Sequence, residues 1–112
     1  MRFASLGSGS RGNGTIVASQ TTVIPVDCGF SYRDTLHRLR RLELEPNDLS
    51  GIVVTHEHGD HVSGVETLAN KHSIPVYASR GTWIEVGEKK FTNPIYINTL
   101  FSIDDIDIIP VT

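Results

Sequence analysis

The sequence predicts a single α/β domain, residues 1–112, in which helices and strands form layers. Three observations lead to this class. β-rich segments dominate the first 26 residues, helical patterns then alternate with short apolar runs, and strand patterns return after residue 100. Such alternation is typical of layered α/β domains. The 112 residues, 38% apolar and 21% charged, also have the composition of one small globular domain.

The first part of the chain predicts strands joined by a glycine-rich loop and a polar turn. Residues 2–6 alternate between apolar and polar and indicate a strand. Residues 7–14 contain four glycines, so this segment is expected to be a loop. Residues 15–18 and 22–26 are β-rich runs separated by a short polar stretch, which predicts a hairpin.

Helical patterns and apolar runs follow. Ser31, with Asp34 three residues later, is a typical helix start. The apolar run Ile52–Val54 predicts a strand that is buried on both faces. Further helices are predicted by the leucine spacing at Leu36, Leu39 and Leu42, by an apolar helical face at Val65, Leu68 and Ala69, and by a candidate cap at Ser79 before Trp83 and Ile84. Further strands are predicted at Val76–Ala78 and near Leu100–Ile103 and Ile106–Val111.

Composition excludes several functional classes. The formal net charge of −3 is not the basic balance of a general nucleic-acid binder. No apolar run reaches the length of a transmembrane helix, and glycine interrupts the N-terminal segment too early for a signal peptide. The single cysteine, Cys28, is expected to be a small buried side chain, with a place at the mouth of a site as the alternative. We therefore expect a cytoplasmic protein with no membrane contact.

A basic cluster lies on the first predicted helix. It comprises Arg33, His37, Arg38, Arg40 and Arg41. A charge run of this kind is usually a solvated helix face. A patch that steers phosphate groups is the alternative.

Residues 55–61 read T-H-E-H-G-D-H and directly follow the predicted buried strand. They fall at the carboxyl end of that strand, where open α/β sheets commonly bind ligands. His56 and His58 can hold one cation from two sides, and Asp60 and His61 can face a second. Imidazole and carboxylate are usual zinc ligands and also suit manganese or iron. Two such cations, about 4 Å apart, can hold a bridging hydroxide as nucleophile.

The pattern H-x-H-x-D-H at residues 56–61 resembles the signature of the metallo-β-lactamase superfamily of metal-dependent hydrolases. Residues 27–29, D-C-G, resemble the earlier aspartate motif of that family. The glycine-rich start, residues 6–15, is similar to the branch that includes phosphodiesterases, tRNA-processing endonucleases and YycJ/WalJ-like nucleases. The resemblance covers the whole chain and implies half of a four-layer αββα sandwich.

The resemblance implies a role for each matching residue. His56 and His58 would bind a first metal, and Asp60 and His61 a second. Asp60 would also accept a proton as water attacks phosphorus. Asp27 would orient the histidine loop by hydrogen bonds, as metal ligands commonly require. The implied cofactor is up to two divalent metals, zinc first, with manganese or iron as alternatives.

The glycine-rich segment also has a physical case of its own. Backbone N–H groups in such a turn can bind an anion, and Ser8, Ser10 and Asn13 add side-chain donors. We expect either a loop that contacts phosphate or a tight connection whose glycines adopt positive φ.

The second part of the chain departs from the family pattern. No histidine follows His72, and Asp104, Asp105 and Asp107 indicate a turn and solvated strand positions rather than a bridging ligand. His37 and His72 stand alone and are expected to be ordinary polar side chains. We therefore expect the N-terminal half of a longer fold, whose open sheet face would drive homo-oligomerisation.

The expected function is metal-dependent hydrolysis of a phosphodiester, with nucleic acid as a candidate substrate, although the site of this chain alone is expected to be incomplete. Hydrolysis of an acyl substrate, such as a thioester, a lactone or a β-lactam, is a second hypothesis. A non-catalytic fragment that binds a metal or a partner is a third.

Overall fold

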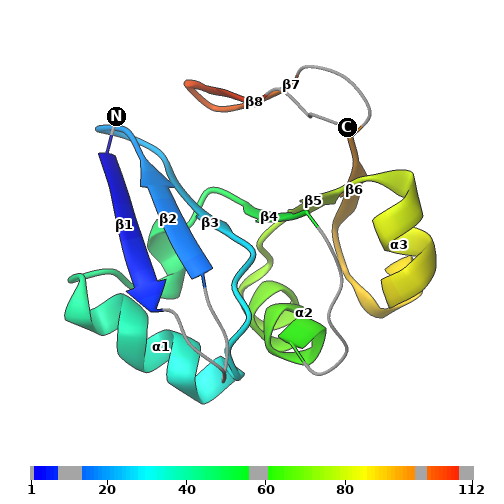
Figure 1. The fold of residues 1–112 in the computed structure, drawn as a ribbon, viewed down its shortest axis with the longest axis horizontal. Helices are drawn as coiled ribbons and strands as arrows, with labels where there is room; N and C mark the ends of the chain where they lie inside the picture. The colour runs from blue at the N-terminus through cyan, green and yellow to red at the C-terminus, as the bar shows by residue number, and fades with distance from the viewer. Residues whose placement is uncertain (1, 8–13, 56–60, 98–100, 109–112) are drawn as a thin grey trace.

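The computed structural model describes residues 2–7, 14–55, 61–97 and 101–108 (Figure 1). The strands are β1 (Arg2–Gly7), β2 (Gly14–Ala18), β3 (Val23–Val26), β4 (Ile52–Val54), β5 (Val76–Ala78), β6 (Pro94–Tyr96), β7 (Phe101–Ile103) and β8 (Ile106–Ile108). The helices are α1 (Tyr32–Arg41), α2 (His61–His72) and α3 (Arg80–Val86), with the 3-10 turns η1 (Pro46–Asp48) and η2 (Glu88–Lys90). No helix within these described ranges is long and apolar enough to cross a membrane.

Strands β1 to β6 form one sheet in which the spatial order equals the order along the chain. β1, β2 and β3 are antiparallel neighbours, whereas β3 to β6 pair in parallel. Helices α1 and α2 lie on one side of the sheet and the β7–β8 hairpin lies on the other (Figure 1). The predicted α/β class is therefore confirmed, and the segments that follow β3 and β4 leave the sheet at the same edge.

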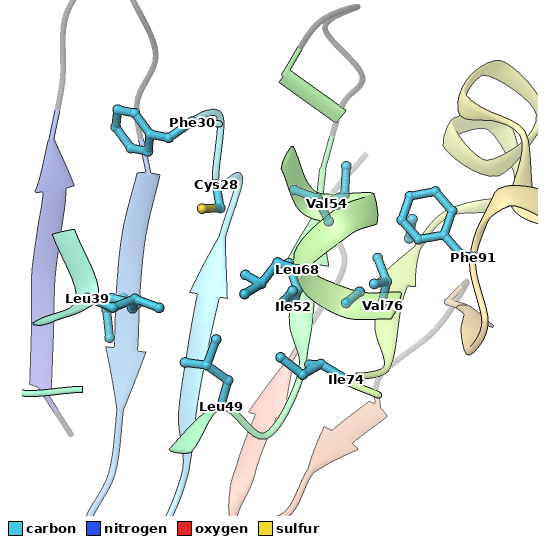
Figure 2. Packing of buried hydrophobic residues seen from close by; sticks show 14 of the residues in the cluster. Cys28, Phe30, Leu39, Leu49, Ile52, Val54, Leu68, Ile74, Val76 and Phe91 are labelled. Carbon is cyan, nitrogen blue, oxygen red and sulfur yellow. The ribbon is translucent and has the colours of Figure 1, made fainter. Parts of the chain in front are cut away.

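The larger hydrophobic core lies between the sheet and the helices. Ile52 and Val76 are almost fully buried, and Leu68 of α2 packs over them (Figure 2). Leu39 brings α1 into the same core and has no exposed surface. Full burial of one such side chain stabilises the fold by about 1.5–3 kcal/mol. The prediction that Ile52–Val54 is a buried strand is confirmed.

Hydroxyl caps begin α1 and α3 where the sequence predicts. The Ser31 hydroxyl oxygen accepts a hydrogen bond from the N–H of Asp34 at 3.2 Å. The Ser79 hydroxyl oxygen accepts one from the N–H of Thr82, also at 3.2 Å. Each bond satisfies a backbone donor that has no partner inside the helix. Both predicted helix starts are confirmed.

A second, smaller core lies on the other face of the sheet. Ile103 and Ile106 of the β7–β8 hairpin pack against Ile24 and Val53. The β7–β8 hairpin does not cover the edge strand β1, where Phe3 is 72% exposed. The inner face of the sheet, on the side of the hairpin, is thus closed in its middle and open towards β1.

A hydrogen-bonded tie holds the hairpin to the β2–β3 turn. Asp105, at the tip of the β7–β8 hairpin, accepts a hydrogen bond from the Ser19 hydroxyl at 2.8 Å and another from the Thr22 hydroxyl. These bonds, the one from Thr22 first, lower the pKa of the Asp105 carboxyl below its ordinary value of 3.8. The prediction that Asp104 and Asp105 form an exposed turn is confirmed, and the tie is an addition to it.

Two details, at Leu42 and at β6, differ from expectation. Leu42, expected on the apolar face of the first helix, lies one residue past α1 and is 37% exposed. The helix predicted around Trp83 and Ile84 is confirmed as α3, with Trp83 buried and Ile84 69% exposed. The edge strand β6 has no counterpart in the sequence prediction; the Trp83 indole N–H donates to the Ile95 carbonyl at 2.9 Å and secures it.

Candidate metal centre

The candidate site lies where β3 and β4 end side by side. Val26 of β3 pairs with Val53 of β4, and the N–H of Asp27 donates to the Val53 carbonyl at 2.9 Å. Asp27 has a φ of 52°, in the left-handed region. Aspartate tolerates this conformation better than most residues because its short side chain can hydrogen-bond locally. The chain therefore turns sharply at Asp27 and leaves its carboxylate beside the end of β4.

The Asp27 carboxylate binds the residue that precedes the histidine motif. One carboxylate oxygen accepts the N–H of Thr55 at 2.7 Å, and the other accepts the Thr55 hydroxyl. Hydrogen bonds to a carboxylate are stronger than bonds between neutral groups. They fix the backbone immediately before His56. The role of Asp27 towards a metal stays a prediction, but its contacts are those that a residue orienting the loop requires.

The far end of the motif is fixed by a close backbone contact. The motif ends at His61, the first residue of α2, and Gly64 lies in the first turn of that helix. A Cβ atom on Gly64 would lie 2.0 Å from the Phe30 carbonyl oxygen. Only glycine allows α2 to approach the backbone this closely.

Both ends of the histidine motif are therefore held by one short stretch of chain. We call Asp27–Phe30 the anchor segment: its first residue binds Thr55, and its last residue contacts Gly64. The sequence signal for this arrangement was partial. The D-C-G resemblance pointed to Asp27, but nothing in the sequence indicated that Gly64 lies against Phe30.

Most of the predicted site residues lie outside the described residues. This holds for the predicted ligands His56, His58 and Asp60 and for the predicted phosphate-contacting residues Ser8, Ser10 and Asn13. His61 is described only as the start of α2. Within residues 2–7, 14–55, 61–97 and 101–108, no three His, Cys, Asp or Glu side chains gather closely enough to hold a metal ion.

Cys28, His72 and His37 occupy ordinary structural positions outside the motif. Cys28 is buried and lies 3.5 Å from the Thr35 hydroxyl. Burial raises the pKa of its thiol, so Cys28 is the small buried side chain that the sequence predicts and not a reactive thiolate. His72 shares a hydrogen bond of 2.9 Å with the Tyr32 hydroxyl, and His37 is exposed on α1.

The chemistry of the motif fits a divalent metal. The motif offers three imidazoles and two carboxylates, those of Glu57 and Asp60, within six residues. These are the donors that zinc accepts in catalytic sites. The described contacts at Thr55 and Gly64 bring the two ends of the motif to the same anchor segment, as a compact ligand loop requires.

Comparison with known proteins agrees with this chemistry. The model of the family described as "Metallo-beta-lactamase superfamily" matches residues 7–104. The exodeoxyribonuclease YycJ of Bacillus anthracis is 39% identical over 106 residues, which are 95% of this chain and 40% of that protein. The exodeoxyribonuclease WalJ of Streptococcus pneumoniae serotype 2 (strain D39 / NCTC 7466) is 33% identical over 94 residues, 84% of this chain and 35% of that protein.

A solved structure gives the same fold. The Rm3 metallo-beta-lactamase superposes with a TM-score of 0.78 at 16% sequence identity, over 94% of this chain and 46% of that chain. At this identity the likeness concerns the fold alone. The chain spans 40% and 35% of the two curated relatives and about half of the solved structure.

Proposed function

The chain belongs to the metallo-β-lactamase superfamily, and we propose that it carries the histidine-loop part of a metal-dependent hydrolase that cleaves phosphodiester bonds in nucleic acid. The observation that carries the substrate class is the similarity to two exodeoxyribonucleases over most of the chain. The contacts of Asp27 with Thr55 support the metal loop itself.

The proposed metal ligands are those that the sequence predicts. His56 and His58 would hold a first divalent ion, and Asp60 and His61 a second, with zinc favoured over manganese and iron by the donor set. When bound, such ions lower the pKa of water and offset negative charge on phosphate oxygens.

The chain's own residues would orient the metal-binding loop, accept a proton and bind the phosphate. Asp27 holds the backbone at Thr55, immediately before the first proposed ligand. Asp60 would accept the proton released as water attacks phosphorus. Ser8, Ser10 and Asn13 would donate hydrogen bonds to the phosphate. Each of these assignments is a proposal for a residue that a point mutation can test.

Metal content gives the first test. The purified chain is loaded with zinc, dialysed and analysed for zinc per chain, beside a His56→Ala variant and a His37→Ala control. His37 is an exposed histidine on α1, so its loss removes one imidazole without touching the motif. We expect zinc to be retained by the unchanged chain and the control and lost in His56→Ala. Equal zinc in all three would contradict the ligand assignment.

Hydrolysis gives the second test. Activity on bis-p-nitrophenyl phosphate and on single-stranded DNA with added zinc or manganese is expected to depend on His58. Activity on thioesters or lactones without activity on either diester would replace the phosphodiester proposal with an acyl substrate. Metal binding without any hydrolysis by this chain would mean that the chain binds metal but needs further residues for catalysis.

We also propose that the open part of the inner face mediates self-association. Phe3, Val17 and Ile24 form one cross-strand row, and the exposure of their side chains falls from 72% at Phe3 to 0% at Ile24. A second copy could cover the exposed end of this row. Sedimentation velocity at micromolar concentration is expected to detect a dimer that a Phe3→Asp variant loses. A monomer at all concentrations would refute this.

A cytoplasmic location is the remaining part of the proposal. It rests on a single buried thiol, which suits a reducing compartment. Fractionation of cells that express the protein tests this location, and finding the chain outside the cytoplasm would contradict it.

A further inference from the structure

The outer face of α1 concentrates positive charge. Four of the ten lysines and arginines of the chain lie in this helix, which contains one acidic residue, while the formal net charge of the chain is −3. Thr35 and Leu39 face the core, whereas Arg33, Arg40 and Arg41 are exposed on the opposite face. We call these three residues the arginine stripe.

Among the described residues, only one of the three arginines of the stripe forms an ion pair. Asp34 pairs with Arg38 at 3.2 Å, and that guanidinium also lies 4.1 Å from the centre of the Phe30 ring, away from the stripe. Glu45 lies 3.6 Å from Arg40 in an ion pair that is largely exposed. In the part of the chain that the structure describes, Arg33 and Arg41 have no ion-pair partner.

Helix stability does not account for the position of Arg33. Arg33 lies in the first turn of α1, where the positive end of the helix dipole disfavours a cation. A solvated helix face usually gains stability by placing an acid four residues before a base. Neither the residue four before Arg41 nor the residue four after Arg33 is acidic, because both positions are His37. Arg40 and Arg41 lie in the last turn, where the helix dipole favours a cation, so the cost to the helix falls on Arg33, while Arg33 and Arg41 both lack an acidic residue four positions away within the helix.

The stripe begins shortly after the anchor segment, which contacts the residues on both sides of the motif. Arg33 is three residues beyond Phe30, the residue of the anchor segment that contacts Gly64 in the first turn of α2. From Arg33 to Arg41 the helix rises by about 12 Å. A strand that enters or leaves the site past the N-terminus of α1 would meet one guanidinium near the site and others along the helix.

Resting on the nuclease function proposed above, we propose that the arginine stripe binds the phosphodiester backbone of the nucleic-acid strand beside the metal centre. Guanidinium groups suit this ligand because they keep their charge and can give two hydrogen bonds to one phosphate. Contacts of this kind hold a strand in place and do not select its bases.

Binding without cleavage tests the proposal. Fluorescence polarisation of a labelled oligothymidine strand is measured in EDTA at several salt concentrations. The test variant is Arg33→Ala with Arg41→Ala, and the matched control is Lys89→Ala with Lys90→Ala. The control removes the same charge from two exposed residues of η2, which follows α3 at the opposite end of the molecule from α1 (Figure 1).

The expected result is specific to α1. At about 50 mM salt, the test variant should lose roughly tenfold in affinity for each arginine, and the slope of log affinity against log salt should flatten by about 1.4. The control should bind like the unchanged chain. Equal losses in the two variants would assign binding to net charge and overturn the proposal, as would no binding by the unchanged chain at low salt.

Two further outcomes separate neighbouring explanations. A labelled polyglutamate peptide that binds more tightly than the oligonucleotide, with the same dependence on Arg33 and Arg41, would assign the stripe to an acidic protein and overturn the proposal. Because EDTA removes divalent metal, the binding result does not depend on hydrolysis. Arginine-dependent binding by a chain that does not hydrolyse a diester would leave the stripe assigned to nucleic acid and would mean that hydrolysis needs residues beyond this chain.

Discussion

Replacing Gly64 by alanine is expected to destabilise this fold, although glycine-to-alanine changes inside helices usually stabilise a protein. The added Cβ would lie 2.0 Å from the Phe30 carbonyl oxygen, 3.0 Å from the Phe30 carbonyl carbon and 3.2 Å from that of Ser31. All three atoms belong to the backbone, so no side-chain rotation relieves the contact. Helix α2 must move off the anchor segment by about 1 Å, and overpacking of this kind costs about 1–3 kcal/mol or more.

The opposing gain is small. Removing glycine from a helix interior gives up to about 1 kcal/mol. We expect Gly64→Ala to lower the free energy of unfolding by about 2 kcal/mol, which in a domain of this size corresponds to a fall in Tm of roughly 10 °C.

The chain offers a matched control for this change. Gly81, in α3, has nothing within 4 Å of the position that a Cβ would take. Gly81→Ala should therefore leave the free energy of unfolding unchanged or raise it by up to about 1 kcal/mol. Urea titration followed by the fluorescence of Trp83, which is buried, measures both variants. If Gly64→Ala proved as stable as Gly81→Ala, the close approach of α2 to the anchor segment would be refuted.

Three further outcomes follow from contacts of single side chains. Thr55→Val removes the hydroxyl donor to Asp27 and should lower the free energy of unfolding by about 1 kcal/mol in urea titration, and an unchanged value would count against that bond. Hydrogen bonds lower the pKa of Asp105 in the folded protein, so the stability they give is present at neutral pH and is lost as the pH falls below 3.8. Asp105→Asn should therefore have a lower free energy of unfolding at pH 7 and a weaker decline of that free energy with acid. Urea unfolding at several pH values measures both. Since burial raises the pKa of Cys28, the native chain should resist a thiol reagent at pH 8 and react fully in urea, and rapid native reaction would contradict the buried position.

The sequence predicted the elements that rest on local patterns. Ser31 and Ser79 could be recognised as helix caps because each hydroxyl accepts a hydrogen bond from the N–H only three residues later, and no distant partner is involved. Ile52–Val54 is a buried strand because a continuous apolar run is what two covered faces require. In both cases the information lies within a few neighbouring residues.

Features that depend on remote partners were not predicted. β6 has three residues and no alternation, and its carbonyl at Ile95 is held by Trp83 from another element. The tie between Asp105 and Ser19 joins positions 86 residues apart. Gly64 is one glycine in a helical pattern until the fold brings Phe30 against it. The metal assignments rest on the motif and on family resemblance, and they stay predictions.

The strand order of the sheet bears on how the chain can assemble. Each strand from β2 to β6 pairs with the strand that directly precedes it in the chain. Closing a short connection costs little entropy, so each of these strands can pair with the preceding strand soon after it has been synthesised. A chain emerging from the ribosome could thus add strands in order, one turn or one helix at a time. The β7–β8 hairpin is the exception, because its tie to Ser19 spans most of the length, and it would dock last on a sheet already made.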